Sequence, residues 1–180
     1  MKTVLRLMLA VLAVGASFGM SGCTDESSRN TLTIVKINEG SSYFSDLLNE
    51  EDSLNMFIPV DEVAVELGNI PNGGGDPIAP GEPFSEIVVT NYTVTYSNGI
   101  YSPVSGGMNL RVPSGGTAIG SIALSHIADK ASLPLSIAVT STATVRFEGY
   151  NYSNGIRAGD KVWAEGTITV QVANFGDGDE

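Results

Sequence analysis

The chain has 180 residues, a net charge of −11 and one cysteine. This length fits a single domain with a real core, and the negative charge argues against nucleic acid or anionic lipid as a partner, because both would be repelled. A single cysteine and a single histidine exclude an intrachain disulfide and a zinc site built from these residues. Solubility is the simplest role for the acidity.

The N-terminal residues 1–22 have the layout of an export signal. Lys2 and Arg6 provide a positive start, and the apolar run 4–18 leads to the small residues in front of Cys23. The alternative is an uncleaved transmembrane helix. That alternative is weaker, because the apolar run is at the short end of the roughly 17–25 residues that a spanning helix needs.

Residues 20–23, Met-Ser-Gly-Cys, resemble the lipobox of bacterial lipoproteins, with Met20 where leucine is usual. The resemblance implies cleavage between Gly22 and Cys23 and acylation of the Cys23 thiol, so that lipid chains hold the protein on a membrane. Because Thr24 follows the cysteine in place of aspartate, the resemblance also implies the outer membrane. We therefore expect an envelope lipoprotein whose membrane contact is the lipid on Cys23, with no thiol left for catalysis.

After the processing site we expect three parts. Residues 23–30 comprise the lipidated cysteine and a flexible polar tether, residues 31–175 form one β domain, and residues 176–180 are an acidic tail. The β-branched run 31–37 predicts the first strand. The spacing of apolar residues in 43–48 predicts one or two helical turns.

The middle of the chain predicts two further strands around a long loop. Alternation over 60–70 indicates a strand with one buried face. The segment 69–83 is rich in proline and glycine, which predicts a surface loop that is either a plain connector or functional. Residues 85–97 form the strongest strand pattern, and the side chains predicted to share its buried face are Val88, Tyr92, Val94 and Tyr96.

Turn residues organise the following segment. An Asn98-Gly99 turn of two residues would place Tyr101 opposite Tyr96. Glycine pairs at 106–107 and 115–116 predict turns on either side of a short strand. That strand spans 108–112, another is expected over 117–124, and a single helical turn is expected within 125–132.

The last part of the chain predicts a long antiparallel hairpin around Asn154-Gly155. A two-residue loop there pairs residues whose numbers sum to 309, so that Phe147 faces Val162 and apolar residues fill one face of both strands. Polar residues, with Trp163 among them, fill the other face. A longer loop of the same parity would give the same two faces.

Short strands separated by turns, with almost no helix, predict an all-β antiparallel sandwich of seven to nine strands with one or two short helical turns. The strand 92–96 resembles the Tyr-x-Val-x-Tyr strand of fibronectin type III and other immunoglobulin-like domains. The closing hairpin over 143–170 is similar to those of uncharacterised bacterial envelope lipoproteins. This resemblance covers about 60–175 and implies an immunoglobulin-like fold and a location, but no activity.

Catalysis and metal binding have little support in the sequence. His126 has Ser125 and Asp129 as neighbours, but residues of one short turn rarely have the geometry of a catalytic triad. The acidic stretches 50–52 and 177–180 have oxygen ligands that calcium prefers, yet neither has the spacing of a known calcium loop. We therefore predict a non-enzymatic protein with no cofactor and no metal.

Aromatic residues are the remaining candidates for a site. Trp163 falls on the polar face of the last strand, and three tyrosines lie near the Asn-Gly turns: Tyr101, Tyr150 and Tyr152. If exposed together, they would mark a contact with an envelope protein or a glycan. The simpler expectation is that the early segment around Tyr43 and Phe44 covers Trp163. We predict a module for protein or surface contacts, with a carbohydrate-binding module as the alternative.

Overall fold

The structure is a computed structural model, and it describes residues 30–50, 54–72, 76–80, 82, 84–153 and 155–175. The predicted signal, the processing site at Gly22 and Cys23, most of the tether and the acidic tail lie outside these residues. So do residues 51–53 and parts of the predicted loop over 69–83. No helix within the described ranges is long and apolar enough to cross a membrane.

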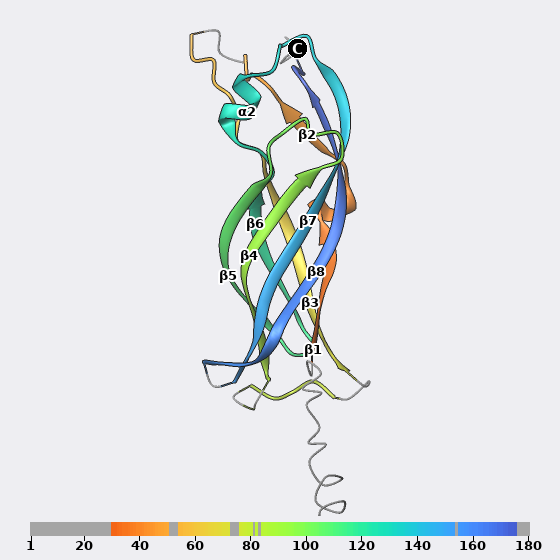
Figure 1. Ribbon diagram of the computed structural model, residues 1–180, viewed down its shortest axis with the longest axis vertical. Helices are drawn as coiled ribbons and strands as arrows, with labels where there is room; N and C mark the ends of the chain where they lie inside the picture. Colours follow the sequence, from red (N-terminus) through yellow and green to blue (C-terminus); the bar gives the residue numbers. More distant parts are fainter. Residues whose placement is uncertain are drawn as a thin grey trace, which may run out of the picture.

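The described chain is built from strands, with one 3-10 turn and one short α-helix. In chain order the elements are β1 (Asn30–Ile37), η1 (Asn38–Gly40), β2 (Tyr43–Asp46), β3 (Glu62–Pro71), β4 (Glu86–Tyr96), β5 (Val104–Pro113), β6 (Thr117–Ala123), α2 (Ile127–Ala131), β7 (Ala138–Ser153) and β8 (Ile156–Ala173). They form two sheets with the strand orders β1-β3-β6 and β2-β8-β7-β4-β5. The sheets make an elongated sandwich (Figure 1), which confirms the predicted all-β fold.

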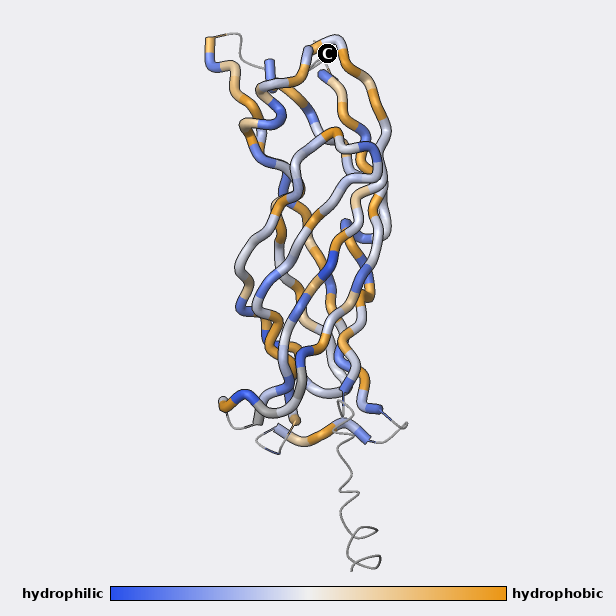
Figure 2. Tube along the Cα trace, in the orientation of Figure 1, coloured by the Kyte–Doolittle hydropathy of each residue, from blue (hydrophilic) through white to orange (hydrophobic). Residues whose placement is uncertain are grey.

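One apolar core fills the space between the two sheets. Apolar and polar residues alternate along the strands (Figure 2), so each strand turns one row of side chains inward. Val65 and Leu67 from β3 belong to one buried cluster with residues of the large sheet such as Val94 and Phe147, and all four are at most 1% exposed. Full burial of such a side chain contributes about 1.5–3 kcal/mol.

Three polar side chains cross this core and tie the sheets together. On β4, the Tyr92 hydroxyl accepts a hydrogen bond from the Ala123 amide at 3.1 Å, and the Tyr96 hydroxyl donates to the Leu124 carbonyl at 3.0 Å. Near the other end, the Asn69 amide of β3 donates to the Val112 carbonyl of β5 at 2.9 Å. These bonds have a fixed direction, so they set how the two sheets lie relative to each other.

The β7–β8 hairpin is confirmed, but its register differs from the prediction. Close to the turn, Tyr152 pairs with Arg157, whereas Tyr150 pairs with Lys161, so β8 gains two extra residues at an irregularity between these pairs. Phe147 therefore lies opposite Ala164 and not Val162. Because the shift is two residues, every side chain keeps its predicted face.

A second irregularity corrects the prediction for β4. Its ladders with β5 and β7 both shift between Val89 and Asn91. Ile87 and Val89 before the shift then share the core face with Tyr92 after it. Val88, which was predicted on that face, is buried on the opposite side of the sheet, because a β-bulge reverses the alternation.

The predicted helix over 43–48 is wrong. Residues Tyr43–Asp46 form strand β2, which pairs in parallel with the end of β8. Ser45 and Leu47 point inward with period two and are at most 1% exposed, while Phe44 points outward. The edge of β8 provides the hydrogen-bonding partner that makes a strand favourable here, and local spacing does not contain that information.

Two turn predictions are also wrong. β5 begins only at Val104, which pairs with Val94, so Asn98-Gly99 does not close a two-residue hairpin and Tyr101 has no place opposite Tyr96 in the ladder. The pair 106–107 lies inside β5. The glycine turn at 115–116 between β5 and β6 is confirmed, with Gly115 at φ +70°.

The close approach of β7 to β4 gives a first test. A Cβ on Gly149 would lie 2.5 Å from the Val88 carbonyl oxygen and 2.9 Å from the Val89 Cα, which are backbone atoms that cannot rotate away. We expect Gly149→Ala to lower the free energy of unfolding by about 1–3 kcal/mol in urea denaturation, as overpacking does elsewhere. Gly107→Ala is the matched control, because nothing lies within 4 Å of its added Cβ. Equal losses for both variants would contradict the proposed crowding.

Candidate functional site

The outer face of the β7–β8 hairpin carries an exposed tryptophan. Trp163 lies between the inward residues Val162 and Ala164, and its side chain is 54% exposed. The guanidinium carbon of Arg146 lies 4.4 Å from the centre of the indole ring. The two residues are diagonal neighbours, since Trp163 pairs with Glu148 and Arg146 pairs with Glu165. This cation–π contact fixes one side of the indole while most of the ring system stays accessible.

Glu148 organises the polar side chains around this tryptophan. Its carboxylate accepts hydrogen bonds from Lys161 at 2.5 Å, from Asn91 at 3.0 Å and from Arg146 at 3.2 Å. These partners, with Lys161 contributing most, lower the pKa of Glu148 from its ordinary value near 4.5 to about 2. The carboxylate therefore stays ionised at neutral pH and serves to hold Arg146 against the indole.

Two of the three predicted tyrosines lie on the same face. Tyr150 is half-buried, and the Arg157 guanidinium carbon lies 3.5 Å from the centre of its ring. Tyr150 is a diagonal neighbour of Trp163, because it pairs with Lys161 in the ladder. Tyr152 is half-buried two residues further along β7. We call Trp163, Arg146, Glu148, Lys161 and Tyr150 the tryptophan platform.

The third tyrosine, Tyr101, does not belong to this surface, which corrects the prediction. It is 3% exposed, its hydroxyl lies 2.8 Å from Ser45 Oγ, and its ring packs edge to face on Tyr96 with 5.2 Å between centroids. Burial raises the pKa of Tyr101 to about 12. Tyr101 lies in the segment between β4 and β5, because β5 begins only at Val104, and this segment directs its side chain into the core.

The early segment does not cover Trp163, so that expectation is wrong. Phe44 points outward and is 59% exposed, and its ring packs edge to face on Phe175 at 5.5 Å. It lies opposite Gln171, near the end of β8, whereas Trp163 lies in the half of β8 that follows the turn. The tryptophan platform is therefore an open surface.

A buried polar cluster that the sequence did not predict lies at the end of the sandwich near α2. Lys130 and Asp61 form an ion pair at 2.9 Å and are 1% and 2% exposed. The Lys130 ammonium also donates to the Pro59 carbonyl at 2.7 Å. The second carboxylate oxygen of Asp61 accepts from Ser45 at 2.6 Å and from Ser125 at 2.5 Å. Both charges are thus paired and hydrogen-bonded, as buried charges must be.

This cluster is closed to substrates and has a structural role. The Ser125 hydroxyl donates a hydrogen bond to the Asp61 carboxylate, and the Asp129 carboxylate accepts from the Ser102 amide and hydroxyl at 2.9 and 3.2 Å. Neither group is therefore oriented toward His126, which is exposed beside them. The residues considered for a catalytic triad do not come together as one.

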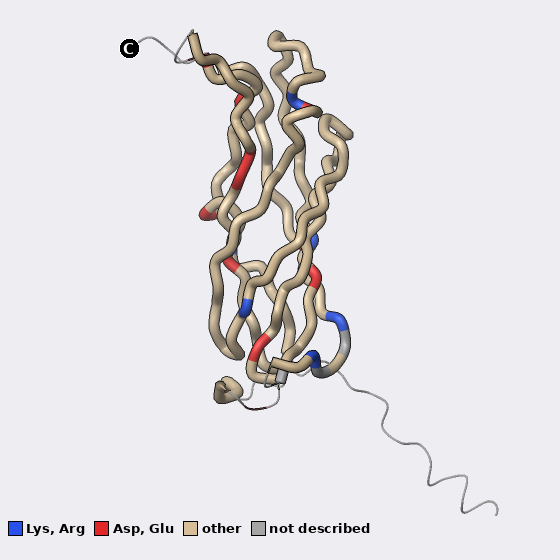
Figure 3. The backbone as a smooth tube through the Cα atoms, turned by 90° about the vertical axis from the view of Figure 1, so that its left-hand side faces the viewer, with Lys and Arg blue, Asp and Glu red and all other residues tan. Residues whose placement is uncertain are grey.

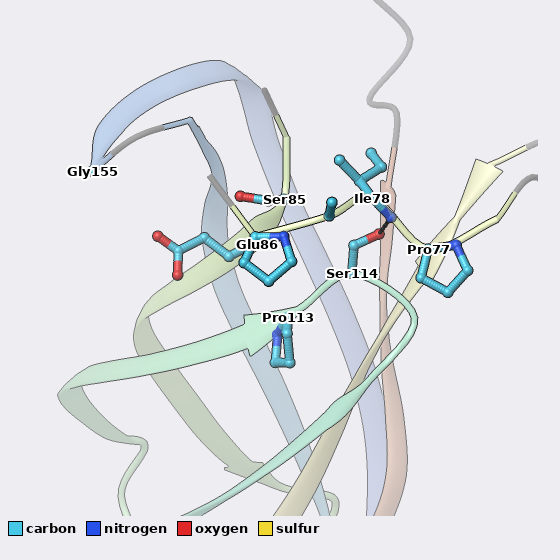
Figure 4. Close-up of a pocket in the computed structure, with 9 residues that line it drawn as sticks. Pro77, Ile78, Ser85, Glu86, Pro113, Ser114 and Gly155 are labelled. Carbon is cyan, nitrogen blue, oxygen red and sulfur yellow. Dashed lines mark hydrogen bonds between the residues drawn. The ribbon is translucent and has the colours of Figure 1, made fainter. Parts of the chain in front are cut away.

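Two shallow depressions that described residues line are found elsewhere on the surface. One, of about 420 Å³, is lined by residues such as Pro77, Ile78, Pro113 and Ser114 near the turn of the β7–β8 hairpin (Figure 4). Its one charged residue, Glu86, pairs with Arg111 on the neighbouring strand. The other, also about 420 Å³, lies between β1 and β8. The described residues that line them include no histidine and no cysteine.

The acidic stretches 50–52 and 177–180 contain the oxygen ligands that calcium prefers. Residues 51, 52 and 177–180 lie outside the described part of the chain. Where the chain is described, no three histidine, cysteine, aspartate or glutamate side chains form a group that could hold a metal ion.

No protein-family model matches this chain, and no curated protein matches its sequence.

The buried ion pair predicts a large effect on stability. Lys130→Met leaves the Asp61 carboxylate buried and uncompensated, so we expect the free energy of unfolding to fall by about 3–5 kcal/mol in urea denaturation. Lys161→Met removes an ion pair whose lysine is half exposed, and should cost less than about 1 kcal/mol. A loss for Lys130→Met as small as that of the control would show that the buried pair contributes little.

The lowered pKa of Glu148 predicts a pH dependence. Its ionised form is favoured by folding, so this stabilisation is complete above the ordinary pKa near 4.5 and is lost as the pH falls toward about 2. We expect the stability difference between the wild type and Glu148→Gln to shrink between pH 5 and about 2. Glu165→Gln, with a carboxylate 4.0 Å from Arg146, is the control and should change less. A constant difference across this range would contradict the prediction.

Proposed function

We propose that this protein is a lipid-anchored, non-enzymatic lipoprotein of the bacterial envelope, in which the β-sandwich is an interaction module and the tryptophan platform is its contact surface. The lipid anchor is inferred from the sequence up to Cys23. Its acyl chains would hold the module at a membrane, with the outer membrane as the proposed location. The module itself would act by contact and without chemistry.

The observation that carries this proposal is the exposed, pre-positioned Trp163. Tryptophan, tyrosine and arginine dominate the energetically important positions of protein interfaces. Here Arg146 is stacked on Trp163 and held by Glu148, so little side-chain freedom remains to be lost on binding. A surface prepared in this way favours binding over a purely solvating role.

The position of the platform agrees with an anchor before Asn30. Asn30 lies at the end of the sandwich that also holds Pro71 and Phe84, because it pairs with the first and bonds to the second. The platform belongs to the half of β7 and β8 nearer this end (Figure 1). The seven residue-to-residue steps from Cys23 to Asn30 span at most about 25 Å when the chain is extended. The proposed partner would therefore be located close to the membrane.

A carbohydrate-binding module is the second candidate. The observation in its favour is that Trp163 presents a flat apolar surface beside the half-buried rings of Tyr150 and Tyr152. An aromatic group of this kind offers apolar area with polar groups at its edge. Glu148, Lys161 and Arg146 would provide the hydrogen-bonding groups around a sugar ring.

The proposal is tested in the native envelope with the full chain. A photo-crosslinking amino acid placed at Glu165, which is exposed two residues from Trp163 on the same face of β8, should give a discrete protein adduct, while the same group at Thr169 should not. Adding Trp163→Ala to the chain with the crosslinker at Glu165 should lower the yield of that adduct about tenfold or more, as loss of a central interface residue does. Binding on a glycan array that is lost in Trp163→Ala would establish the carbohydrate alternative. Absence of both results would refute the platform as a contact surface.

The anchor has a separate test. The wild-type chain should partition into the detergent-rich phase and the Cys23→Ser chain into the aqueous phase. A Cys23→Ser protein that still partitions with membranes would contradict lipidation at this residue.

A further inference from the structure

A second exposed surface lies at the opposite end of the sandwich. Large apolar side chains that are about half exposed or more gather around the segment before β3 and around α2. Leu54 is 90% exposed, and the others lie between 49% and 57%: Met56, Phe57, Val60, Ile127 and Leu135. We call these six residues the apolar tip.

Hydrogen bonds place these residues at one end of the molecule. Phe57 forms an antiparallel bridge with Asn49, shortly after Leu47, whose amide donates to the Ala173 carbonyl at the end of β8. The Pro59 carbonyl accepts from Lys130 of α2, which lies between Ile127 and Leu135 in the chain. Figure 1 shows α2, β2 and the C-terminal end of β8 together at this end, away from the β7–β8 turn.

The buried cluster holds the apolar tip in place. The Lys130 ammonium donates hydrogen bonds to the Pro59 carbonyl and to Asp61. These bonds hold the segment that contains Met56 and Phe57 against α2. The exposed apolar groups therefore belong to an ordered surface. Single exposed apolar residues are normal on proteins, but a concentration of them indicates a contact site.

The charges at this end limit what can bind there. The described segments that form it, 43–50, 54–62, 97–103, 124–137 and 170–175, contain the acidic residues Asp46, Glu50, Asp61, Glu62 and Asp129, and Lys130 as their one lysine or arginine. Lys130 and Asp61 are both buried and neutralise each other, so the acidic border consists of the remaining four residues, Asp46, Glu50, Glu62 and Asp129. Most other Lys and Arg positions lie in the lower half of the sandwich (Figure 3).

From this combination we infer that the apolar tip is a docking site for a cationic amphipathic polypeptide segment, with apolar side chains for the tip and lysine or arginine for its acidic border. Anionic lipid would be repelled by the border, and a second copy of the chain would bring like charges together. The tip is separate from the tryptophan platform, since about ten residues of β8, or roughly 33 Å, lie between Trp163 and Ala173. The inference therefore holds with or without the proposed lipid anchor.

The test uses the purified full chain and a fluorescently labelled amphipathic helical peptide of leucine and lysine. We expect saturable binding by fluorescence anisotropy that is about tenfold or more weaker for Phe57→Asp and for Ile127→Asp. Each substitution adds negative charge, which attracts a cationic peptide, so weaker binding must come from lost apolar contact. Ile156→Asp is the matched control, because Ile156 is 72% exposed at the hairpin turn, and it should bind within about twofold of the wild type.

Four results would overturn the inference. They are no saturable binding by the wild type, an equal loss in Ile156→Asp, Phe57-dependent binding to neutral phosphatidylcholine vesicles, and self-association in sedimentation equilibrium that Phe57→Asp abolishes. The vesicle result would identify a lipid surface as the occupant, and the sedimentation result a second copy. Circular dichroism and urea unfolding establish that each variant is folded. Because Phe57 and Ile127 lie in different segments, one variant still tests the inference if the other does not fold.

Discussion

The buried ion pair between Asp61 and Lys130 is the constraint on which one end of this sandwich depends. Each charge would cost several kcal/mol if buried alone. The structure compensates them with the Pro59 carbonyl and the hydroxyls of Ser45 and Ser125. These partners come from β2, from the segments before β3 and α2, and from α2 itself. One satisfied cluster therefore holds together elements that a short strand and a five-residue helix could not organise by their own propensity.

The tryptophan platform and the apolar tip are two ordered surfaces of the same sandwich, and they have different structural causes. The tryptophan platform is a consequence of strand alternation, because Val162 and Ala164 must face the core and so place Trp163 outside. Its polar neighbours are then fixed through Glu148. The apolar tip is a consequence of the buried cluster, which holds the segment before β3 against α2. The two surfaces differ in chemistry, since one is polar and aromatic and the other is apolar with an acidic border.

Most of the β framework could be predicted from local patterns. Alternation over 60–70, the strand signal over 85–97 and the two faces of the last hairpin all match the structure. The predicted faces of the hairpin are correct because its register shifts by two residues, and only a shift of an odd number would exchange the two faces. The bulge in β4 moves the register by one, and for that reason Val88 was assigned to the wrong face. A bulge leaves no signature in the alternation on either side of it.

The sequence by itself determined most of the strands, the turn at 115–116, the two faces of the last hairpin, the outward position of Trp163 and the motif ending at Cys23. Tertiary structure alone decided that 43–46 is a strand on the edge of β8, that Tyr101 is buried and that Trp163 stays uncovered. It also brought Asp61 to Lys130 across 69 positions of the chain. Period and turn chemistry depend on neighbouring residues, whereas an edge, a bulge or a buried ion pair depends on segments that only folding brings together.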